Sequence, residues 1–174
     1  MRGNKIIKKR KTLRPTTGKV SEALFDILRM EIRDASFIDL YAGTGAVGID
    51  ALKEGASEVV FVEESKRNAE KISGLIEKLH LGERANVITK KVLPFIEWAE
   101  LNGETFDIIF MDPPYHSDEI LNALSAAGSS RILNDGGVVV AEHFAKRSLP
   151  DHINDLHKIK DYNYGDTVLS FYKK

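Results

Sequence analysis

Apolar residues follow two different rhythms along this chain. In the first, they recur every three or four positions, as they do on the buried face of an amphipathic helix. This spacing predicts a first helix that begins at the candidate caps Thr16 and Thr17 and runs to about Arg33. Further helices are predicted after the glycines at 43–48 as far as Gly55, from Ser65 to near Gly82, at 93–101 and from Ser117.

The second rhythm is a short continuous apolar run, which is typical of a strand buried on both faces of a parallel sheet. Five such runs alternate with the predicted helices: one beginning at Phe37, then residues 58–63, 86–89, 106–111 and 138–142. After them, residues 157–162 and 167–172 flank a turn and predict a hairpin. The pattern therefore predicts an α/β fold, a doubly wound sheet with one reversed strand, in one domain spanning 1–174.

The composition is that of a globular domain, with 174 residues of which 43% are hydrophobic and 29% are charged. The chain has neither an apolar run of about 18 residues nor a signal peptide, so we expect no membrane span and a cytoplasmic location. It has no cysteine, and its five histidines lack ligand-like spacing, which predicts that it holds no metal. No predicted helix has a second apolar stripe, so we expect a monomer.

The net charge of −1 conceals an uneven distribution. Residues 1–21 hold eight basic and no acidic residues, whereas the remainder carries a net charge of −9. A positive arm of this kind suits nucleic-acid phosphates, and we expect residues 1–19 to bind RNA. A solvated basic tail is the alternative interpretation.

The most informative stretch joins the first predicted strand to the helix after it, with Asp39 followed by Gly43, Gly45 and Gly48. Glycines let the backbone approach a ligand closely, and a helix that starts there turns free N–H groups toward that ligand. The stretch therefore predicts a nucleotide-type ligand site. The G-x-G-x-x-G spacing, with Glu63 about 20 residues later, also fits an NAD(P) fingerprint, so an oxidoreductase stays open.

A second motif, Asp112-Pro113-Pro114-Tyr115, directly follows the predicted strand 106–111. The carboxyl ends of parallel strands meet at one edge of a sheet, so this motif and the glycine loop should lie together. The tetrapeptide looks like the catalytic signature of amino-group methyltransferases that use S-adenosylmethionine. The motif alone does not select the base, which leaves adenine N6 or another ribosomal guanine as alternative targets. A non-catalytic RNA-binding module is the alternative outside the enzymes.

Five segments together resemble the RsmD family, and the resemblance covers nearly the whole chain. They are Arg14-Pro15-Thr16-Thr17 with Val20 and residues 22–25, the glycine stretch 39–48, Ala51-Leu52 with Gly55-Ala56, residues 112–115, and Tyr164-Gly165-Asp166-Thr167. That family methylates the exocyclic N2 of guanine 966 in bacterial 16S ribosomal RNA. The resemblance therefore implies S-adenosylmethionine as cofactor and 16S rRNA as partner, within the 30S subunit or an assembly intermediate.

The resemblance also implies a fold and a set of residue roles. The fold would be a Rossmann-like class I methyltransferase, with a mainly parallel seven-stranded sheet of order 3-2-1-4-5-7-6, the last strand antiparallel, and helices on both faces. Asp112 and the Pro113 carbonyl would accept hydrogen bonds from the amine. Pro114 would stiffen the loop, and Tyr115 would stack on the base.

The implied cofactor site centres on two acidic residues. Asp39 would reach the methionine amine, and Glu63 would bind both ribose hydroxyls. The other expected cofactor contacts are Tyr41, Ala42, Gly43, Thr44, Gly45, Glu64, Lys91, Val92 and Asp112, and the expected RNA contacts are Arg10, Arg14, Thr16, Thr17 and Lys19.

Overall fold

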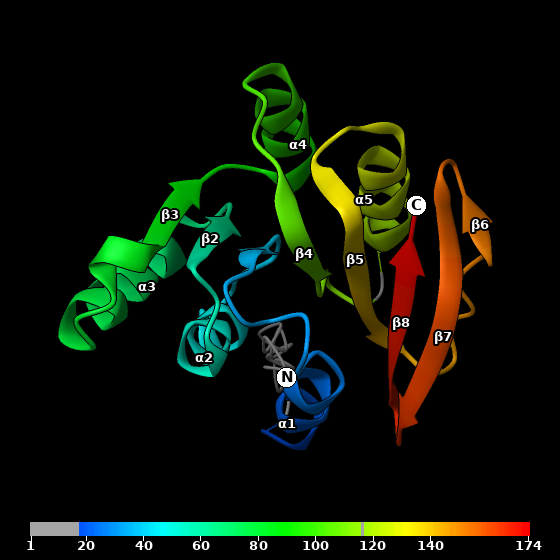
Figure 1. The fold of residues 1–174 in the computed structure, drawn as a ribbon, viewed down its shortest axis with the longest axis horizontal. Coiled ribbons are helices and arrows are strands. Elements are labelled where there is room, and N and C mark those ends of the chain that lie inside the picture. Colours follow the sequence, from blue (N-terminus) through cyan, green and yellow to red (C-terminus); the bar gives the residue numbers. More distant parts are fainter. Residues whose placement is uncertain (1–17, 116) are drawn as a thin grey trace, which may run out of the picture.

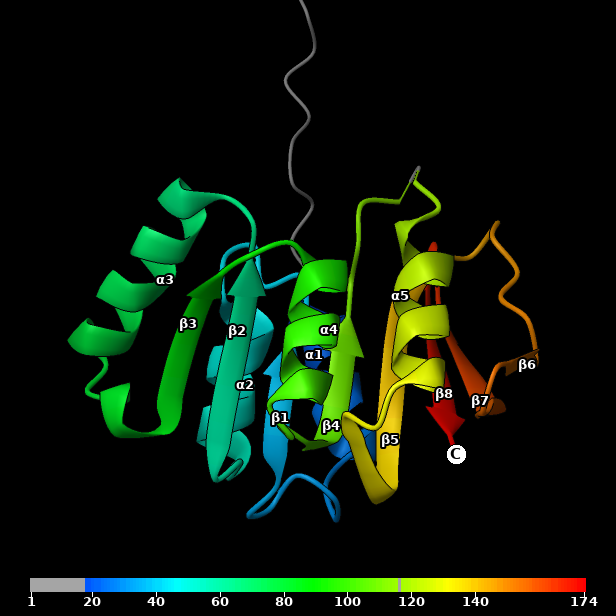
Figure 2. The ribbon, with the colours of Figure 1, turned by 90° about the horizontal axis from the view of Figure 1, so that it is seen from above.

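The structure is a computed structural model that describes residues 18–115 and 117–174. It contains one eight-stranded sheet with helices against both faces (Figures 1 and 2). The strands are β1 (Ser36–Asp39), β2 (Glu58–Glu63), β3 (Ala85–Thr89), β4 (Phe106–Met111), β5 (Leu133–Phe144), β6 (His152–Ile153), β7 (Leu156–Tyr164) and β8 (Thr167–Lys173). The helices are α1 (Gly18–Ile27), α2 (Ala46–Glu54), α3 (Lys66–Lys78), α4 (Val92–Leu101) and α5 (Glu119–Ser129), with a 3-10 turn at Gly82–Arg84.

The strands lie in the order β3-β2-β1-β4-β5-β8-β7-β6. The first five are parallel, β8 is antiparallel to β5, and β7 is antiparallel to β8. The expected order 3-2-1-4-5-7-6 is confirmed for these seven strands, because β7 and β8 are the predicted hairpin. The sheet has eight strands rather than seven, since β6 adds a two-residue pairing with β7 that is too short to leave a pattern in the sequence.

Alternate residues of the central strands point into two separate cores. Phe37 and Phe110 pack with α1, α2 and α3, whereas Ile38 and Ile109 pack with α4 and α5. Figure 1 shows α1 and α2 on one side of the sheet and α4 and α5 on the other. Both faces of the central strands are therefore buried, which explains why their sequences read as continuous apolar runs.

The first helix is shorter than the apolar spacing predicts, because α1 ends at Ile27 rather than near Arg33. Leu28 and Ile32 continue the apolar stripe and are each only 2% exposed, but they lie in turns. Asp34, with a φ of 59°, then leads the chain toward β1. The predicted start of this helix at residues 16–17 lies outside the described residues.

Two boundaries near the catalytic motif also differ from the prediction. β5 begins at Leu133 instead of residue 138, and Gly136-Gly137 lie inside it, where its register with β4 shifts. A Cβ on Gly137 would lie 2.8 Å from the backbone oxygen of Asp107, so the glycine permits this irregularity instead of ending the strand. Helix α5 begins at Glu119, two residues after the predicted start.

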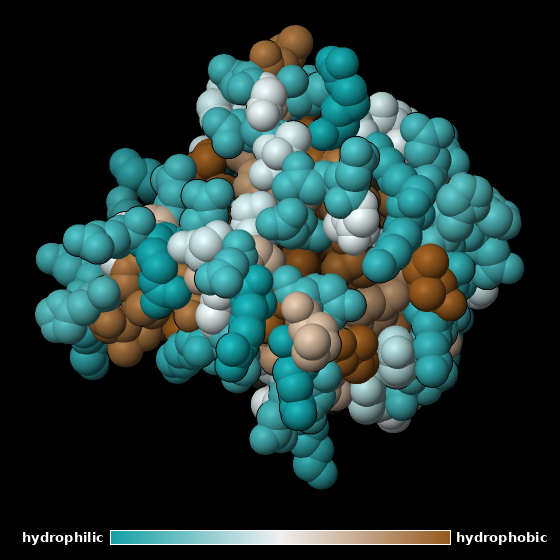
Figure 3. All heavy atoms as spheres, viewed as in Figure 1, coloured by the Kyte–Doolittle hydropathy of each residue, from teal (hydrophilic) through white to brown (hydrophobic). Residues whose placement is uncertain are grey.

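One edge of the sheet brings together the loops that could form a functional site. Figure 2 shows the parallel strands pointing the same way, so the loops after β1, β2, β4 and β5 meet at one edge. On the side seen in Figure 3, hydrophobic residues form small separate areas within a hydrophilic surface. Among the helices of the described ranges, none is long and apolar enough to cross a membrane.

Candidate functional site

The glycine loop links β1 to α2 and is fixed by its own backbone. Gly45 precedes α2 with a φ of 79°, a left-handed conformation that favours glycine, and its N–H donates to the Ala42 carbonyl over 2.7 Å. Gly48 has a different role, since a Cβ there would collide with the ring of Phe61. Gly48 therefore allows α2 to lie close against β2.

Glu63, the last residue of β2, braces this loop. One carboxylate oxygen accepts the Gly43 N–H and the other accepts the Ser65 N–H, each over 2.8 Å. Ser65 in turn caps α3 by accepting the Asn68 N–H. The buried carboxylate thus ties the glycine loop to the start of α3. Each of its oxygens has a second lone pair that can accept a ligand hydroxyl.

Asp39 is the most perturbed acid in the described part of the site. Its side chain is 1% exposed, and burial raises its pKa from 3.8 to about 7, while backbone hydrogen bonds from Gly48 and Tyr41 act in the opposite direction. The carboxylates of Glu63 and Glu142 raise the pKa further. Its Oδ1 atom is buried and has no hydrogen-bond partner among the described residues. A buried acceptor of this kind fits a cationic donor from a ligand.

The other residues expected at the cofactor lie around the same edge. Tyr41 is half-buried, and burial, with the charges of Glu119 and Glu64, raises its pKa. Lys91 precedes the first turn of α4, and the Val92 side chain is 9% exposed within the α4–α5 core. Only the backbone of Val92 is therefore positioned to meet a ligand. Ala42 is buried and Thr44 is exposed.

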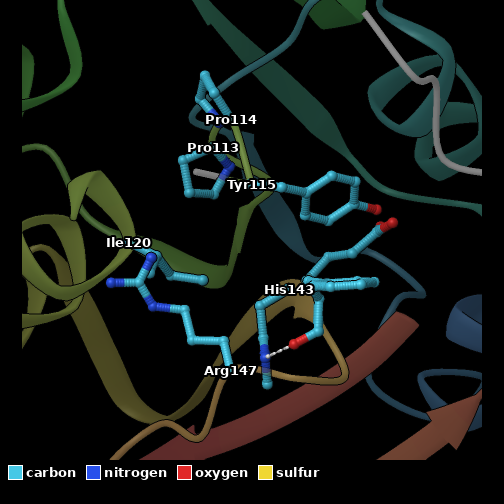
Figure 4. Close-up of a pocket in the computed structure, with 8 residues that line it drawn as sticks. Pro113, Pro114, Tyr115, Ile120, His143 and Arg147 are labelled. Atoms are coloured by element: carbon cyan, nitrogen blue, oxygen red, sulfur yellow. Dashed lines mark hydrogen bonds between the residues drawn. The ribbon is translucent and has the colours of Figure 1, made fainter. Parts of the chain in front are cut away.

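The Asp112-Pro113-Pro114-Tyr115 loop leaves β4 at the same edge and is stabilised by a turn. The Pro114 carbonyl accepts from the N–H of Ser117 over 3.2 Å and from its hydroxyl over 3.0 Å. The ring centroid of Tyr115 lies 6.0 Å from that of Phe144, with 52° between the planes. A small cavity lies between this loop and the end of β5 (Figure 4). It is lined by Pro113, Pro114, Tyr115, Ile120, Glu142, His143, Phe144 and Arg147.

Half of the residues that line this cavity come from β5 and the loop after it, and sequence reasoning did not identify them. Glu142 is 1% exposed and His143 is 5% exposed. The Nε2 atom of His143 lies 2.8 Å from the Ser170 hydroxyl, which donates to Asp161 over 2.5 Å. Burial lowers the pKa of His143. One feature of the sequence could have identified Glu142 and His143, namely their position at the carboxyl end of a predicted parallel strand.

Arg147 joins the two walls of the cavity. Its guanidinium donates to the Ser117 carbonyl over 2.5 Å and to the Asp118 carboxylate over 2.6 Å. Its own turn is held by the Arg147 N–H, which donates to the Phe144 carbonyl over 2.9 Å. Only 24% of the Arg147 side chain is exposed, against 84% for Asp118. The residue therefore holds the segment that follows the Asp112–Tyr115 motif against the end of β5.

Replacing Arg147 by Met is expected to lower kcat about 10- to 100-fold, because the loop loses both hydrogen bonds and the reacting groups lose alignment. The turnover rate under saturating substrate measures this. Arg147→Lys should restore only part of the rate, since an ammonium cannot match the planar fork of a guanidinium. Arg131→Met, which removes a pair with Glu100, is the control. A lower melting temperature with an unchanged kcat would show that Arg147 only stabilises the fold.

The predicted RNA contacts are mostly beyond what the structure describes. Arg10, Arg14, Thr16 and Thr17 lie outside the described residues, whereas Lys19 is exposed in the first turn of α1. Within the described ranges, no three histidine, aspartate or glutamate side chains are grouped as a metal would require. The RNA-binding arm and the absence of a metal both stay predictions.

The whole chain is similar to known proteins. A family model described as "Conserved hypothetical protein 95" matches residues 1–173. Ribosomal RNA small subunit methyltransferase D of Haemophilus influenzae is 32% identical over 131 residues, covering 75% of this chain and 67% of that protein. The Escherichia coli K12 protein of the same name is 28% identical over 138 residues, covering 79% and 68%. The solved structure of a hypothetical protein from Thermus thermophilus has a TM-score of 0.79 at 32% identity, covering 93% of this chain and 89% of that one.

Proposed function

Because the chain belongs to the RsmD family of methyltransferases, we propose that it transfers a methyl group from S-adenosylmethionine to the N2 amine of a guanine in small-subunit ribosomal RNA. The observation that carries the proposal is the meeting of two sites at one sheet edge: the acidic glycine-loop site of Asp39 and Glu63, and the Asp112–Tyr115 loop. Family membership also sets aside the NAD(P)-dependent oxidoreductase.

The residues of the first site fit S-adenosylmethionine. The unpartnered Oδ1 of Asp39 suits the ammonium of the methionine part, and Glu63, at the end of β2, suits the ribose hydroxyls. The backbone beside Lys91 and Val92, at the start of α4, suits the adenine edge. When bound, the cofactor would supply an electrophilic methyl group on its sulfonium: the C–S bond would break with its electron pair kept by sulfur as the N–C bond forms, and the proton lost from the amine would pass to water.

The second site orients the amine. Guanine N2 is a weak nucleophile because its lone pair is delocalised into the ring. The Asp112 carboxylate and the Pro113 carbonyl accept its two N–H bonds, which turns the lone pair toward the methyl group and stabilises the positive charge that develops on nitrogen. Tyr115 supplies a face on which the base, withdrawn from its helix, stacks. The basic residues 1–19 hold RNA phosphates and add affinity without sequence choice.

Methyl transfer to ribosomal particles tests the proposal. Purified protein and labelled S-adenosylmethionine are mixed with 30S subunits, free 16S RNA or 50S subunits from cells that lack the modification, and the nucleosides are then analysed. We expect N2-methylguanosine with small-subunit RNA and none with 50S subunits. Detection of N6-methyladenosine would favour the alternative in which adenine is the target. The absence of label on every particle would overturn the proposal. Comparison of 30S with free RNA shows which of the two is the substrate.

A further inference from the structure

From the geometry of the cavity we infer that Glu142 selects guanine by accepting its N1–H while Asp112 holds the adjacent N2 amine. The inference rests on the proposed function and deepens it, since the Asp112–Tyr115 motif alone does not choose between guanine and adenine. Glu142 would be the residue that makes this choice. It lies in β5, outside both sequence motifs.

The sheet register places Glu142 beside the catalytic motif. β4 and β5 are parallel, with Phe110 opposite Val140 and Met111 opposite Ala141. Continued one residue past the end of β4, this register would bring Asp112 opposite Glu142. Because side chains alternate between the faces of a sheet, both residues would then share a face with Phe110 and Val140, whose core contains α1 and α2. Asp39 lies on the same face, as its pairing with Phe110 requires.

The surroundings of Glu142 make its carboxylate a strong acceptor for a bound base. The residue is 1% exposed, and it lines the cavity together with Pro113 and Tyr115. An ionised carboxylate has several acceptor positions and no donor, so it discriminates between a donor and an acceptor that a base brings against it. The cavity has about 10 Å³ of free space, so entry of a base requires the Tyr115 and Phe144 rings to move apart.

The chemistry of the bases then decides the specificity. Guanine carries a donor, N1–H, next to its exocyclic amine. Adenine carries an acceptor, N1, next to N6, and cytosine carries an acceptor, N3, next to N4. A second carboxylate beside the amine-binding group is therefore satisfied by guanine and repelled by the other two amino bases.

An RNA with one changed base tests this inference. Small-subunit RNA is assembled with either guanine or 2,6-diaminopurine at the target position; the analogue keeps the N2 amine but has an acceptor at N1. We expect kcat/KM of the wild-type protein to favour guanine by at least about 100-fold. Glu142→Gln should reduce this ratio to within about tenfold, because a carboxamide can donate to the analogue and accept from guanine. Glu97→Gln, an exposed change on α4, should leave the ratio unaltered.

The outcomes separate the inference from the function on which it rests. The same ratio in wild type and Glu142→Gln would overturn the role of Glu142 while leaving guanine methylation intact. A weaker affinity for S-adenosylmethionine in Glu142→Gln, with an unchanged ratio, would assign the carboxylate to the cofactor instead. If the wild-type protein methylates neither guanine nor 2,6-diaminopurine at the target position, the proposed function fails, and the inference fails with it.

Discussion

Replacing Asp112 by alanine is expected to lower the rate of methyl transfer by about 10²- to 10³-fold, the usual cost of losing one oriented polar group that stabilises a transition state. Asp112 follows β4 and begins the loop that lines the cavity. Without its carboxylate, the amine loses one of two acceptors and its lone pair is no longer fixed toward the methyl group. Single-turnover transfer of labelled methyl to 30S subunits measures the effect directly, because it isolates the chemical step from product release.

The same variant separates catalysis from RNA binding. The dissociation constant for RNA should change by less than about threefold, since most RNA affinity comes from phosphate contacts. Asp135→Ala provides a matched control, because Asp135 is an exposed aspartate in the first part of β5. An unaltered rate in Asp112→Ala would show that Asp112 does not orient the amine, whereas RNA binding with no methyl transfer by either protein would favour the non-catalytic RNA-binding module.

Replacing Asp39 by asparagine is expected to stabilise the protein without cofactor. The pKa of Asp39 is raised in the folded state, from 3.8 to about 7, so the folded protein binds more protons than the unfolded chain between these values. Its ionised form therefore costs stability, and this cost grows as pH rises through that window and is complete above it. We expect Asp39→Asn to raise the free energy of unfolding by about 2–4 kcal/mol at pH 8 and by less than about 1 kcal/mol near pH 4.

Denaturant unfolding of both proteins at pH 4, 6 and 8 measures this difference. Asp50→Asn, which makes the same change at a half-buried position in α2, is the control. A wild-type stability that rises between pH 4 and pH 8 relative to Asp39→Asn would contradict the raised pKa.

The same substitution should weaken binding of S-adenosylmethionine by about 10- to 100-fold, because the ammonium loses a charged partner. In the wild-type protein an ammonium beside Asp39 would lower the pKa of that carboxyl, so binding releases a proton near pH 7 and tightens as pH rises. Calorimetry in two buffers with different ionisation enthalpies detects the released proton. A proton count near zero for the wild-type protein would place the amine elsewhere.

The part of the site around the glycine loop could be predicted from short stretches of the sequence. The bounds of β2 and β4 agree with the apolar runs, Ser65 caps α3, and Gly55 ends α2. Each of these features depends on residues within a few positions of one another. The glycine spacing and the position of Glu63 at a strand end could be recognised for the same reason.

The part of the site around β5 and the loop after it could not be predicted, because it depends on contacts between distant segments. The length of β5 depends on its pairing with β4 and β8, and the end of α1 depends on how the chain must turn into β1. Arg147 acquires its role only because it contacts Ser117 and Asp118, which lie about 30 residues away in the sequence.

The sequence by itself thus predicted the fold class and the positions of the glycine loop and of the Asp112–Tyr115 motif, because periodicity and short motifs encode them locally, and the resemblance to the RsmD family added the order of the seven main strands. The tertiary structure alone decided which side chains face that motif. Glu142 and Asp112 are 30 positions apart, and the parallel pairing of β4 with β5, as far as Met111 opposite Ala141, is what brings the ends of these strands together. The pKa of Asp39 is raised mainly by burial and further by the charges of Glu63 in β2 and Glu142 in β5, so it could not be predicted from the place of Asp39 in the chain.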